Sequence, residues 1–337
     1  MLTVCDARQR GHAPLQEMQD GAFAAFAESP ERLDAIRGAL GDIAAPEDYG
    51  LAPINAVHAP GYTDFLRSIH AEWTAEGRPG DAIPYVFPTI GRRPLSFERI
   101  DARIGQHCFD MGTPIAAKTW ESAYWAAQTA LTGLARLNAA PSEPVFALCR
   151  PPGHHAGADY CGGYCYLNNA AIAAETARGA GAERVAVLDV DYHHGNGTQD
   201  IFYERPDIFF ASIHADPRQD YPFYWGHADE RGAGPGEGAT LNLPLPRFTR
   251  IEAYLEALDA ALDAIERFAP ELLVVSFGAD TFERDPISEF KLRIDEYPRL
   301  SQRIRRLNYP TLIVMEGGYA IDALGEITTG FLGGFAT

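Results

Sequence analysis

The chain has 337 residues, of which 46% are apolar, so it can bury a large core and is neither disordered nor fibrous. Its formal net charge of −18 argues against a nucleic-acid partner, whose phosphates require an excess of Lys and Arg, and is compatible with cationic ligands. Its odd number of cysteines, five, does not suit a disulfide framework, and neither a signal peptide nor an apolar membrane span is visible, so we expect a cytoplasmic protein with no membrane partner.

The first predicted element is a helix that begins at Ser29-Pro30 and leads into Ile36 and Leu40, with Ser29 as its N-cap and Pro30 in its first turn. Further along, short runs rich in Val, Ile, Leu or Phe predict buried strands at residues 145–148, 185–188, 208–213, 272–277 and 311–315. Helical periodicity predicts helices at residues 120–137, 168–178, 251–268 and 296–307.

Strand and helix therefore alternate along the chain. This alternation favours an α/β fold of three αβα layers, with a central, mainly parallel sheet and helices on both of its faces. Because no repeat and no Gly- or Ser-rich linker divides the sequence, we expect residues 1–337 to form one domain. Ligands of such sheets bind at the carboxyl ends of the strands, and the polar clusters of this chain follow its predicted strands.

Two long irregular segments interrupt the pattern. Residues 76–98 contain several Pro and Gly, and residues 216–238 contain a group of aromatic side chains. Long loops without secondary structure usually form walls or lids of a functional site, and we expect that role for both. The alternative is that they are solvated excursions of the surface.

The segment after the predicted strand 185–188 carries the strongest chemical signal. Side chains of an extended chain alternate between two faces, so Asp189, Asp191 and His193 would project from one face. Asp and His are poor strand formers, and ionisable groups beside a buried strand need partners. The pattern therefore predicts a metal site at this strand end, with a solvated polar strand end as the alternative.

Three other strand ends carry reactive side chains. His154 and His155 lie in a segment of Gly, Pro and aromatic residues, which favours catalytic imidazoles in a shaped pocket over two accidental neighbours. Asp280 supplies a further carboxylate, which is interpreted as the last metal ligand. Tyr319 follows the last predicted strand in a Gly-rich turn, where we favour a hydrogen-bonding role over a merely packed ring.

Together these segments resemble the zinc-dependent deacetylases of the arginase-like superfamily, which include histone deacetylases and bacterial acetylpolyamine amidohydrolases. The resemblance covers nearly the whole chain. It is carried by five motifs: Arg150-Pro-Pro-Gly-His-His-Ala156, Gly163-Tyr-Cys-Tyr-Leu-Asn168, Leu188-Asp-Val-Asp-Tyr-His-His-Gly-Asn-Gly197, Gly278-Ala-Asp-Thr281 and Glu316-Gly-Gly-Tyr319. It is strongest toward the acetylpolyamine amidohydrolases, through Gly197-Thr-Gln-Asp-Ile-Phe-Tyr203 and Asp285-Pro-Ile-Ser288.

The resemblance implies the arginase/deacetylase fold and a centre with one zinc ion. Asp191, His193 and Asp280 would bind the zinc and leave open positions for water and the substrate carbonyl. The superfamily also contains two-manganese guanidine hydrolases, whose extra carboxylates would stand at Gly195 and Gly278. Glycine cannot supply these ligands, so the sequence predicts a mononuclear site.

The resemblance also assigns the catalytic side chains. His155 would be the general base that takes a proton from the attacking water, and Tyr319 would donate a hydrogen bond to the developing oxyanion. His154 would stay protonated because Asp189 accepts its hydrogen bond, whereas His155 faces the neutral Asn196.

Relatives of this kind also hold a monovalent cation, which we expect to be potassium, close to the zinc ligands. The side chains of Asp189 and Ser212 match that site, and the backbone oxygens of Asp191, His193 and Ile213 would complete it. The alternative for Ser212 is an ordinary buried hydroxyl.

The substrate tunnel is also implied by the resemblance. Tyr164 and Tyr221 match the aromatic pair that holds an aliphatic amide chain, and Gly163 lies beside them in the same lining. Asp110 matches a carboxylate at the tunnel mouth that meets a substrate amine, with Glu98 near it. Such a pairing suits cationic polyamines.

The expected function is that of a zinc-dependent deacetylase that hydrolyses a small, cationic acetylated amine, an acetylated polyamine or short diamine, to the free amine and acetate. The loop insertion at about residues 76–99 would contribute to the interface of a homodimer and narrow the tunnel mouth. Two alternatives stay open, a protein lysine deacetylase and a non-catalytic, metal-dependent protein that binds acetylated amines.

Overall fold

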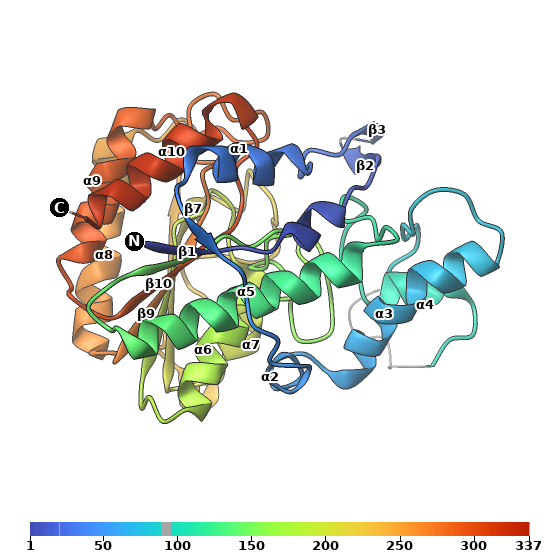
Figure 1. Ribbon diagram of the computed structural model, residues 1–337, viewed down its shortest axis with the longest axis horizontal. Coiled ribbons are helices and arrows are strands. Elements are labelled where there is room, and N and C mark those ends of the chain that lie inside the picture. Colours follow the sequence, from blue (N-terminus) through green and yellow to red (C-terminus); the bar gives the residue numbers. More distant parts are fainter. Residues whose placement is uncertain (20, 89–95, 337) are drawn as a thin grey trace.

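A computed structural model describes residues 1–19, 21–88 and 96–336. Its centre is an eight-stranded sheet in the order β4-β1-β5-β10-β9-β6-β7-β8, in which every neighbouring pair of strands is parallel (Figure 1). The strands are β1 (Leu2–Val4), β4 (Ile43–Ala44), β5 (Val145–Ala147), β6 (Val185–Asp189), β7 (Ile208–Ala215), β8 (Thr240–Leu245), β9 (Leu272–Phe277) and β10 (Thr311–Met315). The five predicted strands are all present, whereas β1, β4 and β8 were not predicted.

Helices cover both faces of this sheet. They are α1 (Glu31–Ala39), α2 (Ala52–Asn55), α3 (Pro60–Ala75), α4 (Ile100–Gln106), α5 (Thr119–Ala139), α6 (Asn169–Gly179), α7 (Asn196–Phe202), α8 (Ile251–Phe268), α9 (Tyr297–Arg305) and α10 (Ile321–Gly334), with 3-10 turns η1 (Ala7–Gly11), η2 (Gly234–Gly236) and η3 (Ile294–Glu296). In Figure 1, α5 and α6 lie on one side of the strands, and α1, α8, α9 and α10 on the other.

Two apolar cores, one on each face of the sheet, hold the helical layers against the strands. Alternate side chains of each strand enter opposite cores: Val145 and Ala147 pack with α5 and α6, whereas Phe146 and Leu148 pack toward α8 and α10. Strands buried on both faces read as continuous apolar runs, which is why the sequence revealed them. The prediction of a three-layer αβα fold is confirmed.

The predicted helices are present with small shifts of their ends, but the predicted Ser29 cap is wrong. The helix α1 begins at Glu31, and Pro30 stands at its N-cap position with no side-chain cap bond. Pro30 already has helical angles, φ −57° and ψ −25°, so Ser29 lies one residue too early to cap the first turn.

A small hairpin stands apart from the main sheet. Its antiparallel strands are β2 (Gln16–Gln19) and β3 (Ala22–Ala25), with Glu17 opposite Ala24. The backbone N–H of Met18 donates to the carbonyl of Met111, which ties the hairpin to the segment after α4. The sequence did not predict this hairpin.

The two predicted irregular segments are confirmed where they are described. No helix or strand lies between α3 and α4 in the described residues 76–88 and 96–99, and residues 89–95 of that segment lie outside the described part. Residues 216–238 contain only the short turn η2. Within the described ranges no helix has the length and apolarity needed to cross a membrane.

The strand order brings the segments with the candidate site residues to one edge of the sheet. The strands β5, β10, β9 and β6 are neighbours and run in the same direction, so their carboxyl ends lie along one edge of the sheet. The four segments singled out in the sequence leave the sheet there.

Candidate active site

Asp191, His193 and Asp280 come together at the ends of β6 and β9 as a buried group. The Nδ1 atom of His193 lies 3.4 Å from Asp191 Oδ1 and 3.2 Å from Asp280 Oδ2, and the candidate ligand atoms of the three residues all lie within 4.8 Å of one another. Backbone N–H groups fix both carboxylates: His193 and Gly317 donate to Asp191, and Tyr192 donates to Asp280. The predicted ligand set is therefore assembled by the fold.

The charge of this group fits a divalent metal. Burial, together with the charge of Asp191, raises the pKa of Asp280 to about 7, because two neighbouring carboxylates without water repel each other. A divalent cation between them would remove that cost. Two carboxylates and one imidazole are also ligands that such an ion takes in a site with open positions.

The surrounding glycines leave no room for the side chains of a second metal site. A Cβ atom at Gly278 would lie 2.0 Å from Asp191 Oδ2, and one at Gly195 would lie 2.2 Å from Asp189 Oδ2. A carboxylate at either position would displace groups already in place. This packing supports the prediction of a single metal ion.

The adjacent imidazoles His154 and His155 have different environments. The Nδ1 atom of His154 lies 2.9 Å from Asp189 Oδ2, and that of His155 lies 2.6 Å from Asn196 Oδ1. Burial lowers the pKa of His154, but the carboxylates of Asp191 and Asp189 outweigh it and raise that pKa to about 10. Burial and the neighbouring histidines hold the pKa of His155 well below its usual value. One ring is therefore a cation at neutral pH and the other a neutral base.

Tyr319 is held from two sides after β10. Its backbone N–H donates to Asp285 Oδ2 at 2.7 Å, and the guanidinium carbon of Arg32 lies 4.9 Å from the centre of its ring. Arg32 also donates to the carbonyls of Glu316 and Gly318, at 2.6 and 2.5 Å. These contacts fix the turn that presents the phenol.

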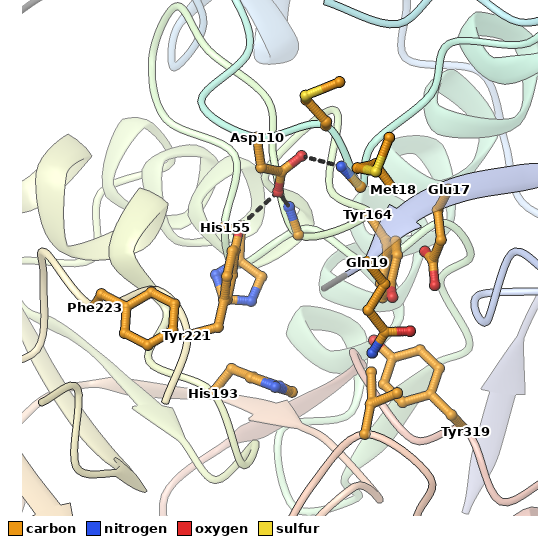
Figure 2. A pocket seen from close by; sticks show the side chains of 14 residues that line it. Glu17, Met18, Gln19, Asp110, His155, Tyr164, His193, Tyr221, Phe223 and Tyr319 are labelled. Carbon is orange, nitrogen blue, oxygen red and sulfur yellow. Dashed lines mark hydrogen bonds between the residues drawn. The ribbon is translucent and has the colours of Figure 1, made fainter. Parts of the chain in front are cut away.

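A cavity of about 300 Å³ lies beside these groups (Figure 2). It is lined by Glu17, Met18, Gln19, Asp110, Met111, Gly112, His155, Gly163, Tyr164, His193, Tyr221, Phe223, Ile287 and Tyr319. The rings of His155, Tyr164 and Tyr221 face the same space as His193 and Tyr319 in Figure 2. The cavity therefore joins the histidine pair, the metal centre and the predicted aromatic lining.

Of the predicted substrate residues, Tyr164, Tyr221, Gly163 and Asp110 line the cavity, whereas Glu98 is exposed and is not among its lining residues. The sequence missed the hairpin residues Glu17 to Gln19 and the loop residues Met111 and Ile287, whereas Phe223 lies in the segment 216–238 that was expected to form a wall. Only the tertiary placement of the hairpin brings Glu17 here, so no local pattern could have revealed it.

Asp110 is already bonded within the protein. Its Oδ2 accepts from the backbone N–H of Gly163 at 2.7 Å and from the hydroxyl of Tyr221 at 2.8 Å, and its Oδ1 accepts from Gly112 at 3.0 Å. Asp110 thus positions two parts of the cavity lining.

The residues predicted to hold a monovalent cation are neighbours. Asp189 and Ser212 are register partners on β6 and β7, and both are fully buried. Asp189 Oδ1 accepts from the backbone N–H of Asp191 at 3.1 Å, and the hydroxyl of Ser212 lies 2.9 Å from His214 Nδ1. The cation itself stays a prediction.

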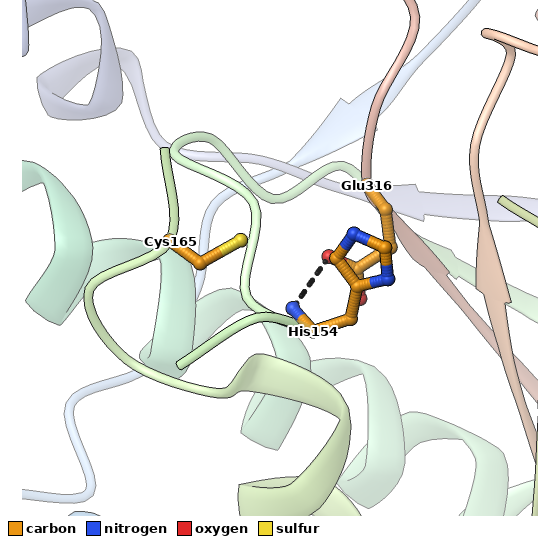
Figure 3. A group of neighbouring side chains, drawn as sticks. All are labelled: His154, Cys165 and Glu316. Carbon is orange, nitrogen blue, oxygen red and sulfur yellow. Dashed lines mark hydrogen bonds between the residues drawn. The ribbon is translucent and has the colours of Figure 1, made fainter. Parts of the chain in front are cut away.

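His154, Cys165 and Glu316 form a second group with possible metal ligands (Figure 3). Both carboxylate oxygens of Glu316 are used, one by the backbone N–H groups of Gly153 and His154 and the other by the hydroxyl of Ser276. Cys165 donates to the carbonyl of Gly163. Because these bonds already satisfy the group, we interpret it as a structural brace behind His154.

Comparison with known proteins shows which family and which relatives the whole chain is similar to. The model of the histone deacetylase domain matches residues 26–335. Acetylpolyamine amidohydrolase 2 of Pseudomonas aeruginosa is 46% identical over 340 residues, covering 99% of this chain and 98% of that protein. The acetylpolyamine amidohydrolase of Mycoplana ramosa is 44% identical over 325 residues, 95% of each chain. The crystal structure of acetylpolyamine aminohydrolase from Burkholderia pseudomallei superposes with a TM-score of 0.96 at 43% identity, covering 100% of this chain and 99% of that one.

Proposed function

The chain belongs to the histone deacetylase family, and we propose that it is a zinc-dependent amidohydrolase that removes the acetyl group from acetylated polyamines or short acetylated diamines. The observation that carries the proposal is the pair His154-His155 beside Asp191, His193 and Asp280. One imidazole is charged and the other neutral, and both stand next to a metal-binding group in a cavity of substrate size.

Asp191, His193 and Asp280 would hold the zinc ion. When bound, zinc would polarise the acetyl carbonyl and lower the pKa of the attacking water. Backbone N–H groups of Tyr192, His193 and Gly317 orient both carboxylates of this set.

His155 takes the proton of the attacking water. Its low pKa leaves its outer nitrogen free to accept a proton at neutral pH, while Asn196 holds the other nitrogen. His154 keeps its positive charge through Asp189 and stabilises the negative charge that develops beside it. The different partners, an amide and a carboxylate, separate the two roles.

Tyr319 donates a hydrogen bond to the carbonyl oxygen as it becomes an oxyanion. Burial raises the pKa of this phenol well above its usual value, so the hydroxyl keeps its proton. The bond strengthens as charge grows on the oxygen, which favours the transition state over the substrate.

The cavity suits a small linear amide. Tyr164 and Tyr221 supply apolar surface for methylene groups, and Asp110 and Glu17 add carboxylates to its wall. An acetylated amine with a second, charged nitrogen matches both features.

Two further elements belong to the proposal. A potassium ion would bind between Asp189 and Ser212, and the segment at residues 76–99 would contribute to a homodimer interface that narrows the entrance. Equilibrium sedimentation tests the dimer, and replacement of potassium by a larger cation during unfolding tests the ion.

The experiment is an acetate-release assay. The metal-free protein is reloaded with zinc and given N-acetylputrescine, N-acetylcadaverine and an acetyl-lysine peptide, with His155→Ala as the control. We expect zinc-dependent release from the acetylated diamines that His155→Ala loses. Preference for the peptide would favour a protein lysine deacetylase. No release from any substrate, with equal binding of acetylated amines by His155→Ala and the parent, would favour a binding protein.

A further inference from the structure

The loop at residues 216–238 forms one side of the cavity. Two of its side chains, Tyr221 and Phe223, line the cavity and lie on the same side of it in Figure 2. The ring of Tyr221 packs nearly at right angles against those of His155 and His193, with ring centres 5.1 and 6.0 Å away. The position of this loop therefore sets the space above the candidate base and one of the candidate metal ligands.

His214 on β7 connects the main sheet to this loop. Its Nε2 atom lies 2.8 Å from the carbonyl oxygen of Gly226, and its Nδ1 atom lies 2.9 Å from the hydroxyl of Ser212. A carbonyl oxygen only accepts hydrogen bonds, so Nε2 carries the proton. Burial lowers the pKa of His214 to about 4, so the ring is neutral at pH 7 and its Nδ1 atom accepts from Ser212. Both ring nitrogens are thus used, and one of them holds the loop.

Gly226 receives this bond in a conformation that suits only glycine. It is buried with a φ of +94°, and a Cβ atom there would lie 2.8 Å from His214 Nε2 and 2.7 Å from His194 Cγ. The missing side chain lets the loop backbone rest directly on the two imidazoles. The N–H of Gly226 donates to Glu230 Oε2 at 2.9 Å, so the N–H and the C=O of this residue both have partners.

Two other side-chain bonds hold the part of the loop around Tyr221, and both lead to irregular segments. Tyr221 donates to Asp110 after α4, and Asp220 accepts from Arg247 after β8, whose side chain is 41% exposed. Exposed ion pairs contribute little to stability. His214, in contrast, is fully buried and lies on β7, between β6 and β8 in the sheet. It is the contact that ties this loop to the sheet.

We propose that His214 is a positioning residue for substrate binding, whose bond to Gly226 fixes the loop where Tyr221 and Phe223 narrow the cavity around a linear amide. The inference rests on the proposed deacetylase function and adds a residue that acts on substrate affinity from outside the cavity. His214 is not among the residues that line the cavity, so it acts through the loop. Loss of the bond leaves a buried carbonyl without a partner, which is costly, and the loop moves to give that carbonyl access to water.

Two substitutions of His214 separate the bond to the loop from the imidazole itself. The amide group of a glutamine reaches about as far as Nε2 and can still donate to Gly226, whereas that of an asparagine ends near Nδ1 and can only replace the acceptor for Ser212. We expect His214→Asn to raise KM for N-acetylputrescine about tenfold with kcat within about threefold. His214→Gln should stay within about threefold of the parent in both constants, because it restores the donor.

Amide hydrogen exchange reports the state of the loop independently of the reaction. In His214→Asn, peptides from residues 220–228 should exchange faster than in the parent, while peptides from β7 keep their protection. In His214→Gln both regions should behave as in the parent. His70→Asn is the matched control, because it makes the same substitution on α3, outside the cavity lining, and should change neither exchange nor kinetics.

An unchanged KM in His214→Asn, or an equally large rise of KM in His214→Gln, overturns the proposal. Loss of protection throughout β7 in His214→Asn would assign His214 a purely structural role and overturns it as well. If His214→Asn does not fold, Gly226→Ala tests the same contact from the loop, because the added Cβ pushes the loop away from the imidazoles; an unchanged KM there overturns the proposal. If the parent cleaves no acetylated amine, the deacetylase function itself fails, while hydrogen exchange still tests the anchor.

Discussion

The floor and the wall of the cavity are built in different ways. The floor consists of the segments that follow β5, β6, β9 and β10, and its reactive groups are fixed by the register of four neighbouring parallel strands. The wall consists of the hairpin β2–β3 and irregular segments around Asp110 and Phe223, which touch only through tertiary contacts. We therefore propose that the chemistry depends on the part supported by the sheet and that substrate choice depends on the part formed by the hairpin and the loops. Changes in the floor should abolish turnover of every substrate, whereas changes in the wall should alter their ranking.

The largest effect should come from His193→Ala. Removal of one of three ligands should abolish both metal retention and acetate release, which elemental analysis and the release assay measure together. His194→Gln is the control, because His194 lies next in the chain but bonds to Gln199 and Asn242 instead of the metal group. A His193→Ala protein that keeps one metal ion per chain would contradict the assignment of the floor.

Tyr319→Phe should reduce kcat by about 100-fold or more, because it removes one donor to the oxyanion. KM should change little, since the lost bond matters most in the transition state. Steady-state kinetics checks this, with Tyr164→Phe as a matched variant that removes another phenol of the cavity lining. A change in KM alone would mean that Tyr319 contributes to substrate binding and does not stabilise the oxyanion.

Glu28→Gln tests the connection between the two regions. Glu28 Oε1 lies 2.5 Å from the guanidinium of Arg32 and 2.9 Å from that of Arg150, and all three side chains are buried. Breaking such a buried network should lower the free energy of unfolding by about 3 kcal/mol or more, measured by urea denaturation. Glu47→Gln, in an exposed pair with Arg136, should cost less than about 1 kcal/mol. Similar costs for the two variants would show that the buried network stabilises the fold no more than an exposed ion pair does.

Asn196→Asp should shift the pH dependence of kcat/KM, because Asn196 is the partner of His155. A carboxylate in place of the amide favours the protonated imidazole and raises the pKa of His155 from its low value. Since the base must be neutral, the acid limb of kcat/KM should move to higher pH and activity below neutrality should fall. An unchanged acid limb would mean that His155 is not the base.

The smallest effect should come from Phe223→Ala in the wall. Phe223 lines the cavity but half of its surface is exposed, so its loss should change KM by about twofold and leave kcat unaltered. A large loss of kcat would show that this segment takes part in the chemistry.

The floor could be predicted from the sequence because each of its groups follows an apolar run that reads as a buried strand. Asp191, His193, Asp280 and the histidine pair all lie within a few residues of such runs. The resemblance to the deacetylase family, carried by the same segments, is confirmed by the family match over residues 26–335.

The wall could not be predicted in the same way. The strands β2 and β3 are four residues each; β2 has polar residues at three of its four positions, and β3 is mostly alanine, which has a low strand propensity. The strands β1 and β4 have only three and two residues. Local pattern therefore did not reveal the hairpin or the position of Glu17. The sequence matched Asp110 to a substrate amine, but only the structure reveals that its oxygens already accept bonds from Gly163 and Tyr221.

The most direct test of this division is competition between two substrates. Zinc-loaded protein is given equal concentrations of N-acetylputrescine and an acetyl-lysine peptide, and the ratio of their kcat/KM values is measured for the parent and for His214→Asn. The account predicts that the parent consumes the acetylated diamine first and that His214→Asn reduces this preference while it still turns over the amides. A parent that consumes the peptide first would contradict it.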